Sequence, residues 1–105
     1  MKNLSVLYQR EGKNVLAFLQ GSLVNLAALN LKAALPTMVN PNDNLVIDLT
    51  EVTDVDTTGL NALYQTRMSC DINNIDMVLK FQKSHPLLNL LNLTRSENHF
   101  EIRYS

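Results

Sequence analysis

Residues 54–60 of the 105-residue chain read DVDTTGL and gather two carboxylates, two hydroxyls and a glycine within seven positions. They follow an apolar run, at a point where a buried strand is expected to give way to a helix. A helix N-terminus exposes unpaired amides and carries partial positive charge, and Asp and Thr side chains accept hydrogen bonds from those amides. The simplest interpretation of Asp56, Thr57 and Thr58 is therefore a helix cap, with Gly59 allowing another backbone or a partner to approach closely.

The same positions are also compatible with phosphorylation. A threonine hydroxyl at a helix N-terminus is a suitable phosphate acceptor, because that end tolerates the charge of roughly −1.5 to −2 that phosphorylation adds. Glu51, Asp54 and Asp56 already make the segment acidic. A phosphate on Thr57 would raise this negative potential and repel a closely fitted partner surface. The local residues alone do not distinguish a cap from a switch.

A catalytic role is not predicted. A threonine nucleophile needs a base, and the two histidines, His85 and His99, belong to other elements far along the chain and are expected on the surface. Asp54 and Asp56 could hold magnesium, but two alternating acids in a turn are common. The sequence contains no GxGxxG, no phosphate-binding loop, no Cys/His metal spacing and no nucleophile elbow. We therefore expect a binding protein that is not an enzyme and needs no metal or cofactor.

The composition indicates a single globular domain over residues 1–105, with 46% apolar residues and a formal net charge of −1. This charge gives no electrostatic footprint for nucleic acid or an anionic membrane. The single cysteine, Cys70, has no partner for a disulfide, which favours a reducing compartment. The first residues turn polar too soon for a signal peptide, and no apolar run is long enough to cross a bilayer. We therefore expect a cytoplasmic protein without direct membrane insertion.

Two apolar runs near the start of the chain, residues 4–8 and 15–19, flank a polar turn that contains Gly12. They predict an antiparallel hairpin. The second run is apolar at every position, which indicates an interior strand covered on both faces. We expect Gly21 to end this strand.

Helical patterns separate the later strands. Spacings of three and four from Leu23 predict a first helix, which either ends near Leu35 or continues through a distorted turn at Pro36. A second helix follows DVDTTG, and Ser84 is a suitable N-cap for a third. The remaining strands are expected at residues 44–49, 77–81 and 100–104.

The resulting order is strand, strand, helix, strand, helix, strand, helix, strand. A helix between two strands allows parallel pairing through a crossover, whereas the opening hairpin is antiparallel. This order predicts an α/β fold in two layers, with a mixed sheet of four or five strands and helices packed on it.

The segment LVIDLTEVTDVDTTGLNAL, residues 45–63, resembles the signature of the STAS domain family, the anti-sigma factor antagonists and their relatives. In that signature an apolar strand ending in Asp-Leu leads to Asp-Ser/Thr-Ser/Thr-Gly-Leu. Residues 15–21 and the helical pattern after them resemble the family's second strand and first helix. Residues 90–94 and 100–102 resemble its closing helix and strand. The resemblance covers nearly the whole chain and implies a STAS-like fold.

By position, the phosphorylated hydroxyl of the family falls on Thr57. Family members of this class bind a GHKL-type serine/threonine kinase that serves as an anti-sigma factor or switch protein. They capture it while the hydroxyl is free, phosphorylation breaks the complex, and a PPM-type phosphatase restores it. The resemblance thus implies signal transduction by partner switching, in the regulation of transcription. The implied partner-binding residues are Asp54, Asp56, Thr57, Thr58, Gly59, Leu60 and Asn61.

Two departures from the family pattern are visible. Many members carry Gly-Glu-Leu-Asp at the turn into the first helix, where this chain has Gly21-Ser22-Leu23-Val24. Threonine at the phosphoacceptor position is also found in the small STAS subunit of ABC-type phospholipid transporters, whose Asp-Thr-Gly-Gly segment contacts the transporter ATPase without a phosphate switch. Thr58 in place of that first glycine favours the regulatory branch. A constitutive accessory subunit of such a transporter is the alternative.

Overall fold

The structure is a computed structural model that describes residues 3–105. The predicted order of strands and helices is confirmed. The elements are β1 (Ser5–Glu11), β2 (Asn14–Leu23), α1 (Asn25–Ala34), the 3₁₀ turn η1 (Leu35–Met38), β3 (Asn44–Val55), α2 (Thr57–Ile72), β4 (Asp76–Phe81), α3 (Pro86–Thr94), the 3₁₀ turn η2 (Glu97–His99) and β5 (Glu101–Tyr104).

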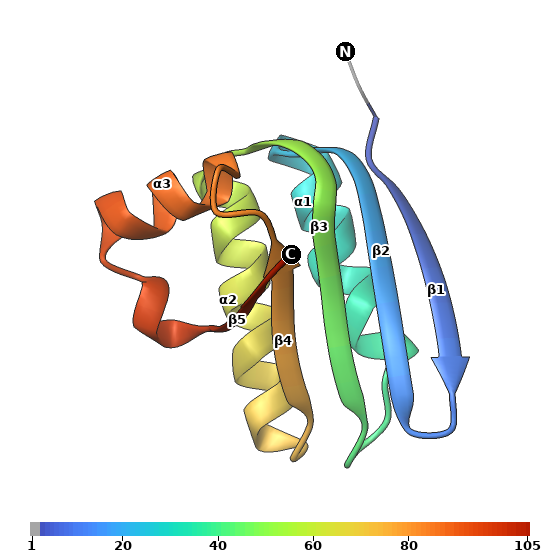
Figure 1. Ribbon diagram of the computed structural model, residues 1–105. Helices are drawn as coiled ribbons and strands as arrows, with labels where there is room; N and C mark the ends of the chain where they lie inside the picture. The colour runs from blue at the N-terminus through green and yellow to red at the C-terminus, as the bar shows by residue number, and fades with distance from the viewer. Residues whose placement is uncertain (1–2) are drawn as a thin grey trace.

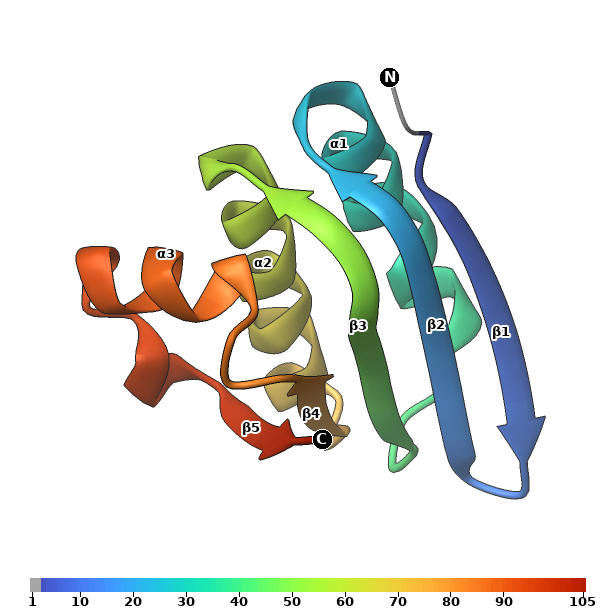
Figure 2. The same cartoon turned by 45° about the horizontal axis from the view of Figure 1, so that its top comes forward.

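The five strands form one mixed sheet in the order β1-β2-β3-β4-β5 (Figures 1 and 2). β1 is antiparallel to β2, and the other neighbours are parallel. Each parallel pair is joined by a crossover through α1, α2 or α3, because a short turn cannot connect parallel strands. The predicted α/β fold with a mixed sheet and packed helices is confirmed.

The helices α1 and α2 lie side by side on one face of the sheet, and α2 lies between α1 and α3 (Figures 1 and 2). Alternate residues of the inner strands point toward these helices and are buried. None of the helices that the structure describes is long and apolar enough to span a membrane. The main buried residues of the sheet are Val15, Ala17, Leu19, Leu45, Ile47, Leu49, Met77, Leu79 and Phe81.

No helix of residues 3–105 covers the opposite face of the sheet (Figure 1). The prediction that the second strand is covered on both faces is therefore wrong. β2 is an interior strand because β1 and β3 flank it, but Leu16 and Phe18 are only half-buried. Their apolar neighbours on this face, Val46 and Val78, are half-buried as well, so these side chains shield one another without a covering layer.

β2 does not end at Gly21, as predicted, but continues to Leu23. Gly21 has a φ of 109°, and the register between β2 and β3 shifts directly after it. A Cβ at this position would clash with the backbone oxygen of Asn3. The glycine therefore permits a bulge, and the bulged strand carries the chain on to the start of α1.

α1 ends at Ala34, and the chain continues through Pro36 as the 3₁₀ turn η1. Of the two predicted outcomes, the distorted turn is the one found. Pro36 lies in the first turn of η1, where its missing amide hydrogen removes no hydrogen bond.

The N-cap of α3 is His85 rather than the predicted Ser84. Nδ1 of His85 accepts a hydrogen bond from the amide of Leu87 at 3.0 Å, and Nε2 donates to the carbonyl oxygen of Val52 at 2.7 Å. His85 is only 5% exposed and its ring packs against Phe81, so the predicted surface position is wrong. Both hydrogen bonds require the neutral ring with its proton on Nε2. Burial lowers the pKa of His85.

We expect the stability that His85 contributes to depend on pH. The folded state favours the neutral ring, so the contribution is complete above the unfolded pKa of about 6.5 and falls as the pH drops toward the lower folded pKa. His85→Ala should lower the free energy of unfolding by about 2–4 kcal/mol at neutral pH, through two lost hydrogen bonds and a cavity. Urea unfolding should show that the difference between parent and variant shrinks between about pH 7.5 and about pH 5. An equal difference at both pH values contradicts the assignment.

The start of α2 lies directly against the end of β2. Gly59, in the first turn of α2, is buried, and a Cβ there would clash with the carbonyl oxygen of Leu23. The same Cβ would lie 3.0 Å from Cγ1 of Val55. The φ of Gly59 is not positive, so it is the close approach of two backbones that requires glycine here.

We expect Gly59→Ala to destabilise the fold by about 1–3 kcal/mol, because α2 must move away from β2 to admit the methyl group. Asn61→Ala, an exposed change in the same helix, is the matched control and should shift the free energy of unfolding by less than about 0.5 kcal/mol. Urea unfolding of the three proteins gives the comparison. A Gly59→Ala variant more stable than the parent, as helix propensity alone would predict, excludes the close contact.

Candidate functional site

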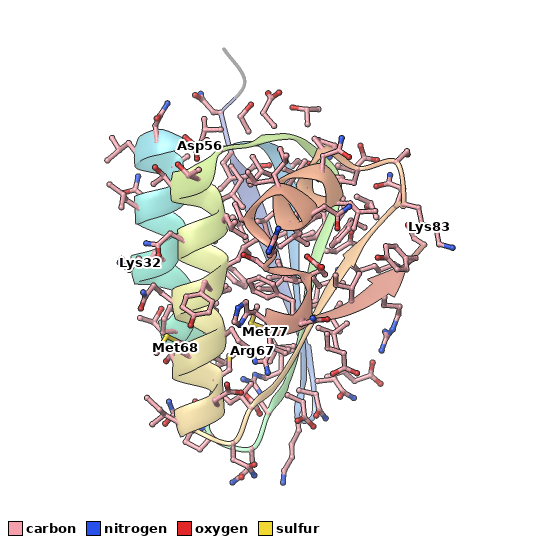
Figure 3. The ribbon with its side chains drawn as sticks, turned by 90° about the vertical axis from the view of Figure 1, so that its left-hand side faces the viewer. Lys32, Asp56, Arg67, Met68, Met77 and Lys83 are labelled. Atoms are coloured by element: carbon pink, nitrogen blue, oxygen red, sulfur yellow. The ribbon has the colours of Figure 1, made fainter. Side chains whose placement is uncertain are left out.

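The predicted site lies where β3 ends and α2 begins. Asp56 is the N-cap of α2, and its Oδ1 accepts a hydrogen bond from the amide of Gly59 at 2.8 Å. Thr57 and Thr58 are the first two residues of the helix. The cap predicted from the residue types is confirmed. Figure 3 shows Asp56 at the end of the two neighbouring helices.

The two hydroxyls of the motif differ in accessibility. Thr57 is exposed, whereas Thr58 is half-buried. Within residues 3–105, neither hydroxyl makes a hydrogen bond to another side chain or to the backbone. An enzyme that modifies a hydroxyl from outside therefore meets Thr57 first.

Asp54 joins the end of β3 to the end of β2. Its Oδ2 accepts a hydrogen bond from the hydroxyl of Ser22 at 2.8 Å and from that of Thr53 at 3.2 Å. Ser22 is buried and stands at the position where many family members carry glutamate. A glutamate there would place a second carboxylate against Asp54, and the two like charges would repel. The small serine therefore fits the acid on the neighbouring strand.

Asp56 makes a second connection of the same kind. Its Oδ2 accepts a hydrogen bond from the amide of Asn25, the first residue of α1, at 3.2 Å. The N-cap of α1 is Val24, which has no capping side chain. The turn into α1 carries no acid at positions 22 and 24, but Asp54 and Asp56 reach it from the end of β3. Together with Glu51, we call these two residues the acidic junction.

A shallow, mostly apolar cleft of about 290 Å³ opens beside Thr57, between α2 and the segment that links α3 to β5. Leu60 and Phe100 are buried in its wall, and the ring of Tyr64 meets that of His99 edge to face, with centroids 5.4 Å apart. Its lining consists of Thr57, Leu60, Asn61, Tyr64, Thr94, Ser96, His99 and Phe100.

The part of this cleft contributed by the end of the chain could not be predicted from the sequence. His99 is exposed, as predicted, but the fold brings it into the same cleft as Thr57. No pattern near His99 or Phe100 signals this, because the contact depends on where α3 directs the chain. Tyr64 could have been found, since it lies one helical turn beyond Leu60 and on the same face of α2.

Two other candidates for chemistry are a reactive cysteine and a metal site. Cys70 is buried, and burial raises the pKa of its thiol to about 11, so the nucleophilic thiolate is scarce at neutral pH. Across residues 3–105, no group of three or more His, Cys, Asp or Glu side chains is arranged to hold a metal ion. The group that remains as a candidate for chemistry is the exposed hydroxyl of Thr57, which follows the acidic junction in the chain and lines the apolar cleft.

Solved structures with a similar fold include an anti-sigma factor antagonist from Mycobacterium paratuberculosis, with a TM-score of 0.79 and 19% identity, covering 95% of this chain and 85% of that one. The anti-sigma factor antagonist SpoIIAA in its unphosphorylated form has a TM-score of 0.70 and 11% identity, covering 96% of this chain and 89% of that one. An uncharacterised protein with a SpoIIAA-like fold from Shewanella loihica has a TM-score of 0.59 and 10% identity, covering 100% and 87% of the two chains. At these identities the similarity establishes a SpoIIAA-like fold.

Curated protein sequences contain no match to the chain. The family model of the STAS domain, by contrast, matches residues 6–102. The match includes the hairpin, all three helices and the junction between β3 and α2. The chain therefore belongs to the STAS domain family.

Proposed function

We propose that this protein is an anti-sigma factor antagonist. It binds a GHKL-type serine/threonine kinase or anti-sigma partner while Thr57 is unphosphorylated and releases it when Thr57 carries phosphate. The observation that carries the proposal is the exposed, unbonded hydroxyl of Thr57 at the start of α2, next to the acidic junction. Two proteins of similar fold are anti-sigma factor antagonists, which supports the same class of function at low identity.

The charges around Thr57 explain how phosphate would act. Asp54 and Asp56 are held in place by hydrogen bonds, so their carboxylates keep a fixed position at the end of β3, directly before Thr57 in the chain. A phosphate adds roughly −1.5 to −2 charge to this surface. A partner that fits closely around a neutral hydroxyl then meets both steric bulk and a strongly negative potential. The complex is expected to dissociate without any large change in the fold.

The docking surface combines polar and apolar parts. Of the implied contact residues, Asp54, Thr57 and Asn61 are exposed and free to meet a partner. Gly59 and Leu60 are buried and act through packing, Gly59 against β2 and Leu60 as a wall of the cleft. An apolar side chain of the partner inserted in the cleft would provide the buried anchor that dominates many interfaces.

A PPM-type phosphatase is the expected enzyme for removing the phosphate, since the switch must be reversible to signal. Both partners of such a cycle work in the cytoplasm. The protein itself catalyses no reaction in this scheme and requires no cofactor.

Substitution of Thr57 tests the switch. Thr57→Asp should weaken binding to the kinase at least about 100-fold, or about 2.7 kcal/mol, because the added charge opposes the complex. Thr57→Ala should bind within about threefold of the parent, since a free hydroxyl is not needed for contact. Thr58→Ala is the matched control and should remain a substrate of the kinase. Calorimetric titration measures binding, and mass spectrometry after incubation with kinase and ATP locates the phosphate.

Two outcomes would contradict this proposal. One is a Thr57→Asp variant that binds as well as the parent. The other is co-purification with the ATP-binding subunit of a transporter, with no phosphate on Thr57, which would assign the chain to the accessory-subunit class.

The cleft offers an independent test of the docking surface. Asn61→Trp should cover the mouth of the cleft and reduce affinity for the partner by about tenfold, while the free energy of unfolding stays within about 0.5 kcal/mol of the parent. Gln65→Trp places the same ring on an exposed residue of α2 that does not line the cleft and should bind normally. Equal affinity of the two variants would exclude the cleft from the interface.

A further inference from the structure

The carboxylate of Asp56 binds the first turns of two helices at once. Oδ1 accepts from the amide of Gly59 in α2 at 2.8 Å, and Oδ2 accepts from the amide of Asn25 in α1 at 3.2 Å. The two acceptor atoms of one side chain therefore fix the start of α1 relative to the start of α2. Asp56 is also the residue directly before the proposed phosphorylation site.

The start of α1 has little else to hold it. Its own N-cap, Val24, contributes no side-chain hydrogen bond, and its first turn contains no acidic residue. Asn25 has a φ of 51°, in the left-handed region, which asparagine tolerates better than most other residues. The bond from Asp56 is thus the only side-chain cap on this end of α1 among the described residues.

A phosphate on Thr57 would disturb this arrangement in two ways. It would repel the adjacent Asp56 carboxylate, and its oxygens would compete for the amides at the start of α2. The bond to Asn25 is the longer of the two and is exposed, whereas the bond to Gly59 is shorter and partly buried. The bond to Asn25 should therefore be the first to break.

We propose that Asp56 is a positioning residue that transmits phosphorylation of Thr57 to the first turn of α1. This inference rests on the proposed function and adds a second effect of the phosphate to it. Leu26 and Leu29, which follow Asn25 in α1, are 67% and 50% exposed. A shift at Asn25 moves these apolar side chains as well. Phosphate then acts in two ways, by its charge at Thr57 and by releasing the start of α1.

The substitution Asp56→Asn should keep one of the two hydrogen bonds and remove the other. The amide side chain has a single acceptor oxygen and can cap only one helix, and asparagine is a good N-cap for α2. Phosphothreonine incorporated at position 57 during synthesis provides the modified protein without any kinase. Glu51→Gln is the matched control, because it removes a neighbouring charge and Glu51 makes no side-chain hydrogen bond to α1 within residues 3–105.

The readout is amide hydrogen exchange measured residue by residue by NMR. In both Asp56→Asn and the phosphorylated protein, the amide of Asn25 should exchange at least about tenfold faster than in the parent, as expected for the loss of a hydrogen bond to a charged group. The amide of Leu60, which bonds to the carbonyl oxygen of Asp56 at 2.9 Å, should keep its protection. Glu51→Gln should match the parent at both positions.

Unchanged exchange at Asn25 in either altered protein overturns the inference. If phosphate abolishes partner binding while Asn25 stays protected, the switch stands and the transmission through Asp56 is wrong. If phosphothreonine at position 57 leaves partner binding intact, the proposed function fails, and faster exchange at Asn25 still supports Asp56 as the residue that positions α1.

Discussion

The parallel pairing of β2 and β3 determines where the site lies. Because both strands run in the same direction, both end at the same edge of the sheet, and the chain leaves them into α1 and α2 side by side. At this edge Gly59 lets the backbone of α2 approach Leu23 closely, and Asp56 bonds to the first amides of both helices. The position of the acidic junction and of Thr57 depends on this contact between the ends of β2 and β3.

This geometry also places carboxylates at the turn where the chain departs from the common family pattern. The turn into α1 lacks acidic residues, yet carboxylates stand against it from the neighbouring strand. Asp54 bonds to Ser22, and Asp56 bonds to Asn25. Compared with the family pattern, the chain lacks acidic residues at positions 22 and 24. In the folded protein, the carboxylates of Asp54 and Asp56 nevertheless lie at this turn. Asp56 belongs to the family signature itself, whereas Asp54 lies outside that pattern and brings its carboxylate to Ser22.

The parts of the fold that follow from local chemistry could be predicted. The apolar run before Asp48 and the capping residues after it identify β3 and the start of α2, because both signals lie within a few residues. The burial of His85 could not be predicted in this way. It depends on the carbonyl of Val52 in another element, and only the packing of α3 brings the two together. The position of Phe100 in the wall of the cleft could not be predicted either, because it also depends on how α3 packs.

In the proposed switch, one phosphate on Thr57 controls binding of the partner. The most direct measurement is a calorimetric titration of the kinase or anti-sigma partner with the same preparation in three states: untreated, fully phosphorylated on Thr57, and then treated with a PPM-type phosphatase. Binding that disappears in the second state and returns in the third agrees with the account. Equal affinity in all three states would contradict it.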